Sequence, residues 1–125
     1  RKDIVVGAGT INDVYKFKEA AEHGAAFFVS PGSTESLLSY AAKNNLVYIP
    51  GVATSSEVIF AEEFGFTHLK FFPAESSGGI KALKSFKPVF QNVHFCPTGG
   101  INEKNYQEYL ALDNVFAVGG SWLSN

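Results

Sequence analysis

The chain has 125 residues, of which 46% are hydrophobic, and a formal net charge of −2. This length and composition predict one globular unit with a substantial core, and the scattered charges with no basic stripe argue against a nucleic-acid partner. No apolar run approaches the roughly 18 residues that cross a bilayer, so we expect no membrane association.

Short apolar or aromatic runs alternate with longer segments of helical period. The predicted strands are residues 4–6, 26–29, 47–49, 68–72, 93–96 and 115–118. The predicted helices are residues 12–22, 35–43, 55–64, 80–86 and 103–110. Strict alternation of strand and helix predicts an α/β fold with a parallel sheet, and the continuously apolar strands indicate that both faces of the sheet are covered.

Two of the predicted helices open with the spacing of a capping box. Thr10 precedes Asp13 by three residues, and Thr54 precedes Glu57 in the same way. This spacing gives both acidic residues a structural task. Thr10 also stands where the first strand ends, so its hydroxyl could serve a site there, but the spacing alone favours the cap.

Glycine and proline follow nearly every predicted strand, which fits two parallel architectures. An open doubly wound sheet can be completed in this length, whereas a (β/α)8 barrel needs about 200 residues or more. The most glycine-rich loops are the last two, at 98–100 and 119–121. Barrels commonly bind phosphate with the loops after strands 7 and 8. We therefore favour a partial TIM barrel: residues 1–125 form one domain with strands 3 to 8, lacking the first two βα units and the last helix.

Lys70 is the candidate catalytic residue because it lies inside the strand-like run 68–73. Desolvation disfavours the ammonium and lowers the lysine pKa, which leaves a free amine able to form a Schiff base. The alternative is a lysine at a strand end that extends to solvent. Period two places His68, Lys70 and Phe72 on one face and Leu69 and Phe71 on the other.

The paired glycines of the last two loops are a candidate anion site. Gly99-Gly100 and Gly119-Gly120 allow backbone N–H groups to converge, and Thr98 and Ser121 can add hydroxyl donors. Two tight turns that use glycine for its backbone freedom are the alternative. The single cysteine, Cys96, fits a reducing cytosol and is expected to be a buried structural thiol. The histidines form no recognisable metal set, so we expect no metal and no cofactor.

Six segments, read in order, resemble the family of 2-keto-3-deoxy-6-phosphogluconate (KDPG) aldolase and 4-hydroxy-2-oxoglutarate aldolase. The lysine motif and the Pro-Thr-Gly-Gly motif carry most of the specificity. The segments are GAGT at 7–10, SPG at 30–32, IPG at 49–51, KFFPAE at 70–75, CPTGGI at 96–101 and GGSW at 119–122.

The resemblance implies a class I aldolase on a (β/α)8 barrel, cytoplasmic and usually a homotrimer. Lys70 would form the imine with the substrate ketone, and the small-molecule partners would be a phosphorylated keto acid and pyruvate. The resemblance also implies a set of substrate-binding residues. These are Thr10 for the pyruvate carboxylate, Pro31 and Phe72 lining the pocket, and Thr98, Gly99, Gly100 and Ser121 for the phosphate.

Two functional residues of the family have no counterpart in this sequence. A general acid/base glutamate and a carboxylate-binding arginine belong to early strands that precede the matched region. Glu75 follows the lysine closely, but we expect it to brace the next loop rather than replace that glutamate. Two other functions stay open: a non-catalytic fragment that binds phosphate or a complementary chain, and a phosphate-binding barrel isomerase that does not need Lys70.

Overall fold

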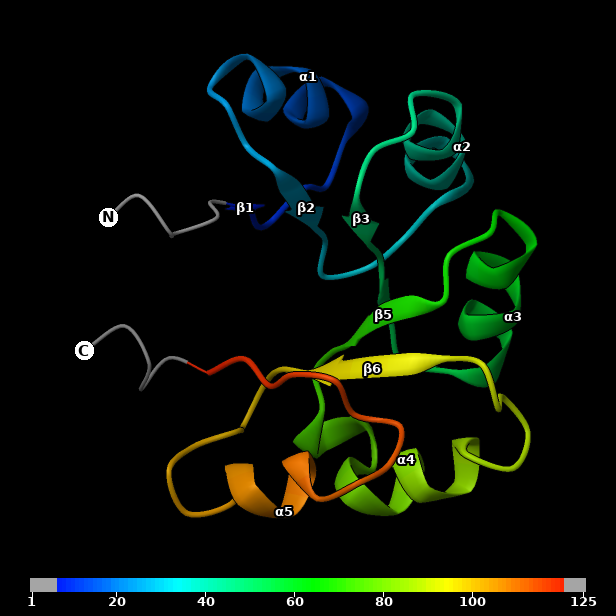
Figure 1. Cartoon of the computed structure of the whole chain (residues 1–125), viewed down its shortest axis with the longest axis vertical. Helices are drawn as coiled ribbons and strands as arrows, with labels where there is room; N and C mark the ends of the chain where they lie inside the picture. Colours follow the sequence, from blue (N-terminus) through cyan, green and yellow to red (C-terminus); the bar gives the residue numbers. More distant parts are fainter. Residues whose placement is uncertain (1–6, 121–125) are drawn as a thin grey trace.

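A computed structural model describes residues 7–120 as strands and helices that alternate along the chain (Figure 1). The strands are β1 (Gly7–Ala8), β2 (Phe27–Val29), β3 (Tyr48–Ile49), β4 (Gly51–Val52), β5 (His68–Phe71) and β6 (His94–Pro97). The helices are α1 (Val14–Glu22), α2 (Glu35–Lys43), α3 (Ser55–Glu63), α4 (Gly79–Phe86) and α5 (Tyr106–Leu110), with a 3-10 turn η1 (Glu75–Ser77) before α4. The predicted strand at 4–6 lies outside the described residues.

All pairs between these strands are parallel, in the orders β1-β2-β3 and β4-β5-β6. The predicted α/β class with parallel strands is therefore confirmed. Figure 1 shows α1 and α2 beside the first sheet, with α4 and α5 beside the second. None of the helices within residues 7–120 is long and apolar enough to span a membrane.

The predicted strand at 47–49 is confirmed as β3, which ends at Ile49, but the sequence did not predict that the chain continues through Pro50 into β4 of the second sheet. On one side of Pro50, Ser30 N–H donates to the Ile49 carbonyl at 3.3 Å; on the other, Lys70 N–H donates to the Pro50 carbonyl at 2.9 Å. Proline has no N–H to give to a ladder, so the strand is divided there into β3 and β4. One extended segment thus connects the two sheets.

The predicted strand at 115–118 is reduced to two isolated bridges, Phe95 to Val115 and Thr98 to Gly119. Phe116 N–H donates to the Phe95 carbonyl at 3.0 Å, and Gly119 N–H donates to the Pro97 carbonyl at 3.0 Å. Between those bonds Pro97 has no N–H to return, so the ladder is interrupted. The segment nevertheless follows β6 in parallel, as the alternation of strand and helix predicts.

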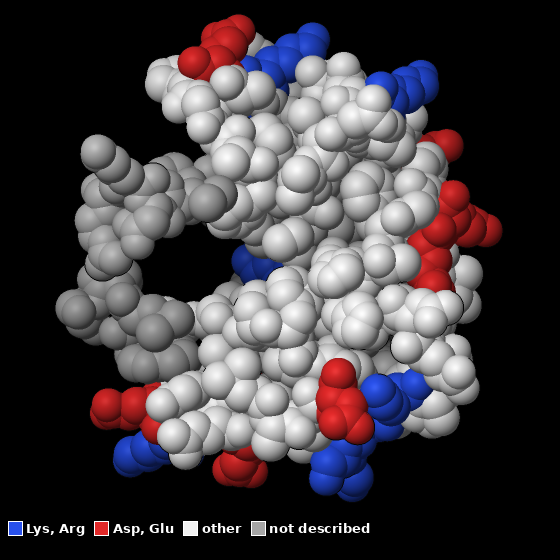
Figure 2. All heavy atoms as spheres, in the orientation of Figure 1, with Lys and Arg blue, Asp and Glu red and all other residues white. Residues whose placement is uncertain are grey.

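Aromatic packing joins the helices to the sheets. Phe17 of α1 is fully buried and contacts Phe28, Tyr40 and Tyr48, with ring centroids 5.0–5.5 Å apart. On the second sheet, Phe86 of α4 packs on the core rings of β5 and β6. Charged side chains lie mostly around the outer rim of the molecule (Figure 2). The core therefore fixes each helix layer against its own strands.

The cap predicted at Thr54 is confirmed, with both bonds of the capping box to Glu57 present. The cap predicted at Thr10 is wrong. Helix α1 begins after Asp13, whose carboxylate accepts from Lys16 N–H at 2.9 Å. The buried Ile11 explains the difference, because its N–H donates to the Val29 carbonyl at 3.1 Å and keeps this part of the chain against the sheet. Thr10 has φ 57° and is left without a capping task.

We expect Gly51→Ala to destabilise the fold by about 3 kcal/mol, because a Cβ there would overlap the backbone carbonyl of Pro31. Gly32→Ala is the matched control: nothing lies within 4 Å of its Cβ position, and we expect a change below about 0.5 kcal/mol. Urea denaturation of both variants checks this. Equal stabilities would contradict the close packing at the crossing between the sheets.

Candidate active site

The sequence-predicted lysine lies at the carboxyl end of β5. In the register of β5 with β6, Lys70 is opposite Cys96 and Phe71 is opposite Pro97. Leu69 and Phe71 are fully buried in the core, whereas Lys70 is half-buried on the other face, as the period-two pattern predicts. The strand thus uses its apolar residues for packing and directs the amine away from the core.

Lys70 has an apolar environment on its own face. Its Nζ atom lies 4.8 Å from the centroid of the Phe72 ring, and no carboxylate within residues 7–120 forms an ion pair with it. Burial lowers the pKa of Lys70 below its ordinary value, while a negative charge on Cys96 would act to raise it. A lowered pKa increases the fraction of neutral amine near pH 7, and the neutral amine is the nucleophile.

Cys96 lies on the same face as Lys70 and is half-buried rather than fully buried. Burial raises the pKa of this thiol, and contacts with Thr98 and Lys70 only partly offset the effect. A raised pKa keeps the sulfur protonated and poorly nucleophilic at neutral pH. Cys96 therefore places an uncharged side chain beside the amine.

The loop after β6 lines a cavity of about 450 Å³. Its three carbonyls are all held on the other side: Thr98 O accepts from Ala74 N–H at 2.8 Å, Gly99 O from Glu75 N–H at 3.1 Å, and Gly100 O from Asn105 Nδ2 at 3.0 Å. Within the described part of the chain, the N–H groups of Gly100 and Ile101 have no acceptor, whereas the Gly99 N–H faces Gly119 in the parallel bridge between Thr98 and Gly119. Such converging amides suit an anion.

Glycine is required at both of these positions. Gly99 and Gly100 have φ values of 103° and 79°, and a Cβ on Gly100 would lie 2.5 Å from Glu75 Cγ. The same loop packs on Pro73, since a Cβ on Gly99 would lie 3.0 Å from Pro73 Cα. The alternative of ordinary turns accounts for the positive φ values but not for the unpaired amides.

Phe72 connects the amine to this cavity. Its ring contacts Lys70 and also lines the cavity. The other lining residues all come from the two glycine-rich loops: Thr98, Gly99, Gly100, Ile101, Asn102 and Gly120. The structure therefore brings five of the predicted site residues together, namely Lys70, Phe72, Thr98, Gly99 and Gly100.

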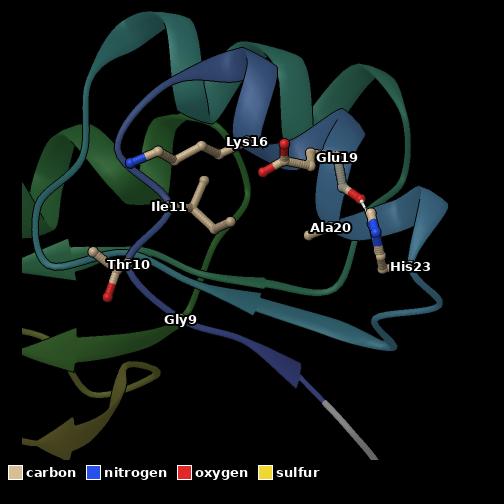
Figure 3. Close-up of a pocket in the computed structure, with 7 residues that line it drawn as sticks. All are labelled: Gly9, Thr10, Ile11, Lys16, Glu19, Ala20 and His23. Atoms are coloured by element: carbon tan, nitrogen blue, oxygen red, sulfur yellow. Dashed lines mark hydrogen bonds between the residues drawn. The ribbon is translucent and has the colours of Figure 1, made fainter.

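Of the remaining three predicted residues, Thr10 and Pro31 do not line this cavity. Thr10 borders a separate cavity of about 420 Å³ against α1, and Figure 3 shows its hydroxyl directed away from Lys16 and Glu19. Pro31 follows β2 and packs its backbone against Gly51. Ser121 lies outside the described residues. Thr10 and Pro31 follow β1 and β2 of the first sheet, whereas Lys70 lies in β5 of the second.

The sequence alone did not identify Asn102, Asn105 and Tyr109 as neighbours of the site. Asn105 Oδ1 accepts from Asn102 N–H at 2.8 Å, and this pair follows directly after the Gly-Gly-Ile segment. Two asparagines three residues apart after a glycine pair are a local signal that could have been read. The predicted bracing by Glu75 agrees with its bonds to the Gly99 carbonyl and the Tyr109 hydroxyl.

The histidines lie away from the amine. His68 and His94 stack at the amino ends of β5 and β6 with ring centroids 5.1 Å apart, and His23 closes α1 with Nδ1 2.8 Å from the Glu19 carbonyl. In residues 7–120, no three His, Cys, Asp or Glu side chains are grouped to hold a metal ion.

Comparison with known proteins gives a consistent result. The model of the family described as KDPG and KHG aldolase matches residues 1–125. A 2-dehydro-3-deoxy-phosphogluconate aldolase of Pseudoalteromonas atlantica is 48% identical over 98% of the chain, and a KHG/KDPG aldolase of Escherichia coli is 47% identical over 97%. The chain spans 57% of the length of each.

A solved structure extends this similarity to the fold. A KDPG aldolase of Legionella pneumophila, with pyruvate captured at low pH as a covalent carbinolamine intermediate, superimposes with a TM-score of 0.94 at 49% identity. The match covers 98% of this chain and 59% of that one.

We expect Cys96→Asp to raise the pKa of Lys70, because a carboxylate at the paired position favours the ammonium. NMR titration of the Lys70 Cε resonance measures this shift, with Lys70→Arg to assign the signal. Cys96→Ser, which adds no charge, should leave the Lys70 pKa unchanged. If Cys96→Asp titrates like the unaltered chain, the two side chains do not share one environment.

Proposed function

Because the chain belongs to the KDPG and KHG aldolase family, we propose that its whole protein is a class I aldolase, a lyase. It cleaves 2-keto-3-deoxy-6-phosphogluconate to pyruvate and glyceraldehyde 3-phosphate, and 4-hydroxy-2-oxoglutarate is a second substrate. The observation that carries the proposal is the half-buried amine of Lys70, unpaired with any carboxylate of residues 7–120, next to a cavity lined by unpaired amides. The covalent pyruvate of the Legionella relative supports the same chemistry.

The reaction uses Lys70 as a nucleophile and then as an electron sink. Its neutral amine adds to the C2 ketone, and the carbinolamine loses water to give a protonated imine. The bond between C3 and C4 breaks, its electron pair moves into the imine as an enamine, and the C4 hydroxyl loses its proton as glyceraldehyde 3-phosphate forms. Protonation of the enamine at C3 and hydrolysis of the imine release pyruvate and restore the amine.

The remaining site residues bind the two ends of the substrate, the carboxylate and the phosphate. Thr10 holds the pyruvate carboxylate, and Pro31 and Phe72 line the pocket. Thr98, Gly99, Gly100 and Ser121 hold the phosphate. The acceptor of the C4 hydroxyl proton is the family's early-strand glutamate, which belongs to sequence before the matched region. The unpaired Gly100 amide supports the phosphate assignment.

The proposed architecture is a (β/α)8 barrel of which this chain supplies strands 3 to 8 as one domain. The single parallel succession of strands supports this reading, as do the strand that crosses between sheets at Pro50 and the segment that follows β6. The first two βα units and the last helix complete the barrel. By family, the whole protein is a cytoplasmic homotrimer of the Entner–Doudoroff pathway and needs no cofactor.

A second candidate is a non-catalytic fragment that binds phosphate or pairs with a complementary chain. The observation that favours it is the open edge of the first sheet, where β1 pairs only with β2 within residues 7–120. An exposed strand edge is a template for another strand. This candidate keeps the anion site but makes no use of a nucleophilic amine.

Borohydride treatment with pyruvate separates the two candidates. We expect the chain to gain the mass of one reduced pyruvate, located at Lys70 by peptide mass spectrometry, because the neutral amine forms an imine that borohydride reduces. Lys70→Arg removes the nucleophile and should gain nothing, while Lys84→Arg, on the outer helix α4, is the matched control that should react like the unaltered chain. Modification spread over several lysines, or none, would favour the non-catalytic candidate.

A further inference from the structure

A tyrosine–carboxylate pair lies directly beneath the anion loop. Tyr109 of α5 is fully buried, and its hydroxyl donates to Glu75 Oε2 in η1. Gly79 confines the pair, since a Cβ there would lie 3.0 Å from the Tyr109 hydroxyl and 3.2 Å from Glu75 Oε2. Burial and the adjacent Glu75 carboxylate raise the pKa of Tyr109, so the phenol stays a hydrogen-bond donor at working pH.

The same glutamate is the support of the loop. Its Cγ and Cβ atoms fill the space where a Cβ of Gly100 would stand, at 2.5 Å and 2.7 Å, and its N–H holds the Gly99 carbonyl at 3.1 Å. Asn105, which holds the Gly100 carbonyl, is the N-cap residue of the helix that carries Tyr109. Glu75 of η1 and Asn105 at the start of α5 therefore hold the carbonyls of two successive peptide groups, Gly99–Gly100 and Gly100–Ile101.

Those two peptide groups carry the N–H groups of Gly100 and Ile101, which have no acceptor within residues 7–120. A carbonyl held on one side of a peptide fixes its N–H on the other, because the peptide unit is planar. Preorganised amides bind an anion more tightly than amides that must first be ordered. Lys70, by contrast, is held by the register of β5 with β6 and forms no hydrogen bond or ring contact with Tyr109.

We propose that Glu75 and Tyr109 are positioning residues that fix the Gly100 and Ile101 amides for the phosphate end of the substrate, and so favour phosphorylated over unphosphorylated keto acids. The inference rests on the proposed function and deepens it. Glu75 acts through the loop rather than as a proton acceptor, since its carboxylate is engaged by the buried phenol.

The test compares inorganic phosphate binding with imine formation in the same 125-residue chain. Tyr109→Phe removes the donor, and Glu75→Leu keeps the packing but removes the acceptor. We expect each to weaken phosphate binding about tenfold by calorimetry, the scale of one net hydrogen bond, and to leave the rate of pyruvate trapping at Lys70 within about twofold. Glu75→Gln retains a carbonyl acceptor and should bind phosphate within about threefold of the unaltered chain.

Tyr48→Phe is the matched control. It removes another buried tyrosine hydroxyl, one 2.6 Å from Ser30 Oγ in the other sheet. This change should lower stability while phosphate affinity stays the same. Glu75 is exposed, so its substitution is expected to leave the fold intact. If Tyr109→Phe fails to fold, the comparison of Glu75→Gln with Glu75→Leu tests the inference instead.

Three results would overturn the inference. Phosphate affinity that is unchanged in both variants, with pyruvate trapping intact, would make the pair an ordinary structural bond and leave the proposed function standing. A parallel loss of phosphate binding and trapping would assign the pair to general stability. An unaltered chain that traps no pyruvate and binds no phosphate would remove the proposed function together with the inference.

Discussion

The parallel pairing of β5 with β6 is the constraint on which the site depends. The register runs from His68–His94 to Phe71–Pro97, so Lys70 and the loop that follows Pro97 reach the same edge of the sheet. Past the strands, Ala74 and Glu75 continue to hold the carbonyls of Thr98 and Gly99. Two parts of the candidate site, from segments far apart in the chain, are thus placed by one set of backbone hydrogen bonds.

This arrangement exchanges stability for reactivity at one residue. A lysine whose pKa is lower in the folded than in the unfolded chain opposes folding at neutral pH, and this penalty decreases as the pH rises from the folded to the unfolded pKa and is absent above it. Leu69 and Phe71, fully buried on the other face of β5, offset that penalty. Leaving the amine without a carboxylate partner keeps its pKa low. The packing of the apolar residues of β5 therefore compensates for the free-energy cost of burying the Lys70 amine.

Local patterns were sufficient for the parts of the site that one segment determines. Alternation in 68–72 predicted the face of Lys70, and the paired glycines predicted the loop at 99–100, because both depend on near neighbours in sequence. Thr10 was predicted as a cap because its spacing fits, but the long-range bond of Ile11 to Val29 moves the helix start to Asp13. Spacing within a segment cannot report such a bond.

The contacts that the sequence could not reveal are those between distant segments. Glu75 and Tyr109 are separated by 34 residues and meet only because η1 and α5 lie on the same side of β6. The continuation of a strand through Pro50 likewise depends on Ser30 and Lys70, which belong to the neighbouring strands. In the local sequence, a proline indicates the end of a strand. Only the hydrogen bonds to the neighbouring strands show that the chain passes from one sheet to the next.

The central claim is that the Lys70 amine and the Gly100 and Ile101 amides are two ends of one site. The most direct measurement is the concentration that gives half-maximal borohydride modification of Lys70, for KDPG and for pyruvate, in the unaltered chain and in Gly100→Ala. We expect KDPG to act at a concentration at least about tenfold lower than pyruvate, and the Gly100→Ala change to abolish that advantage while pyruvate acts as before. Equal concentrations for the two keto acids, or an advantage that survives in Gly100→Ala, would contradict the claim.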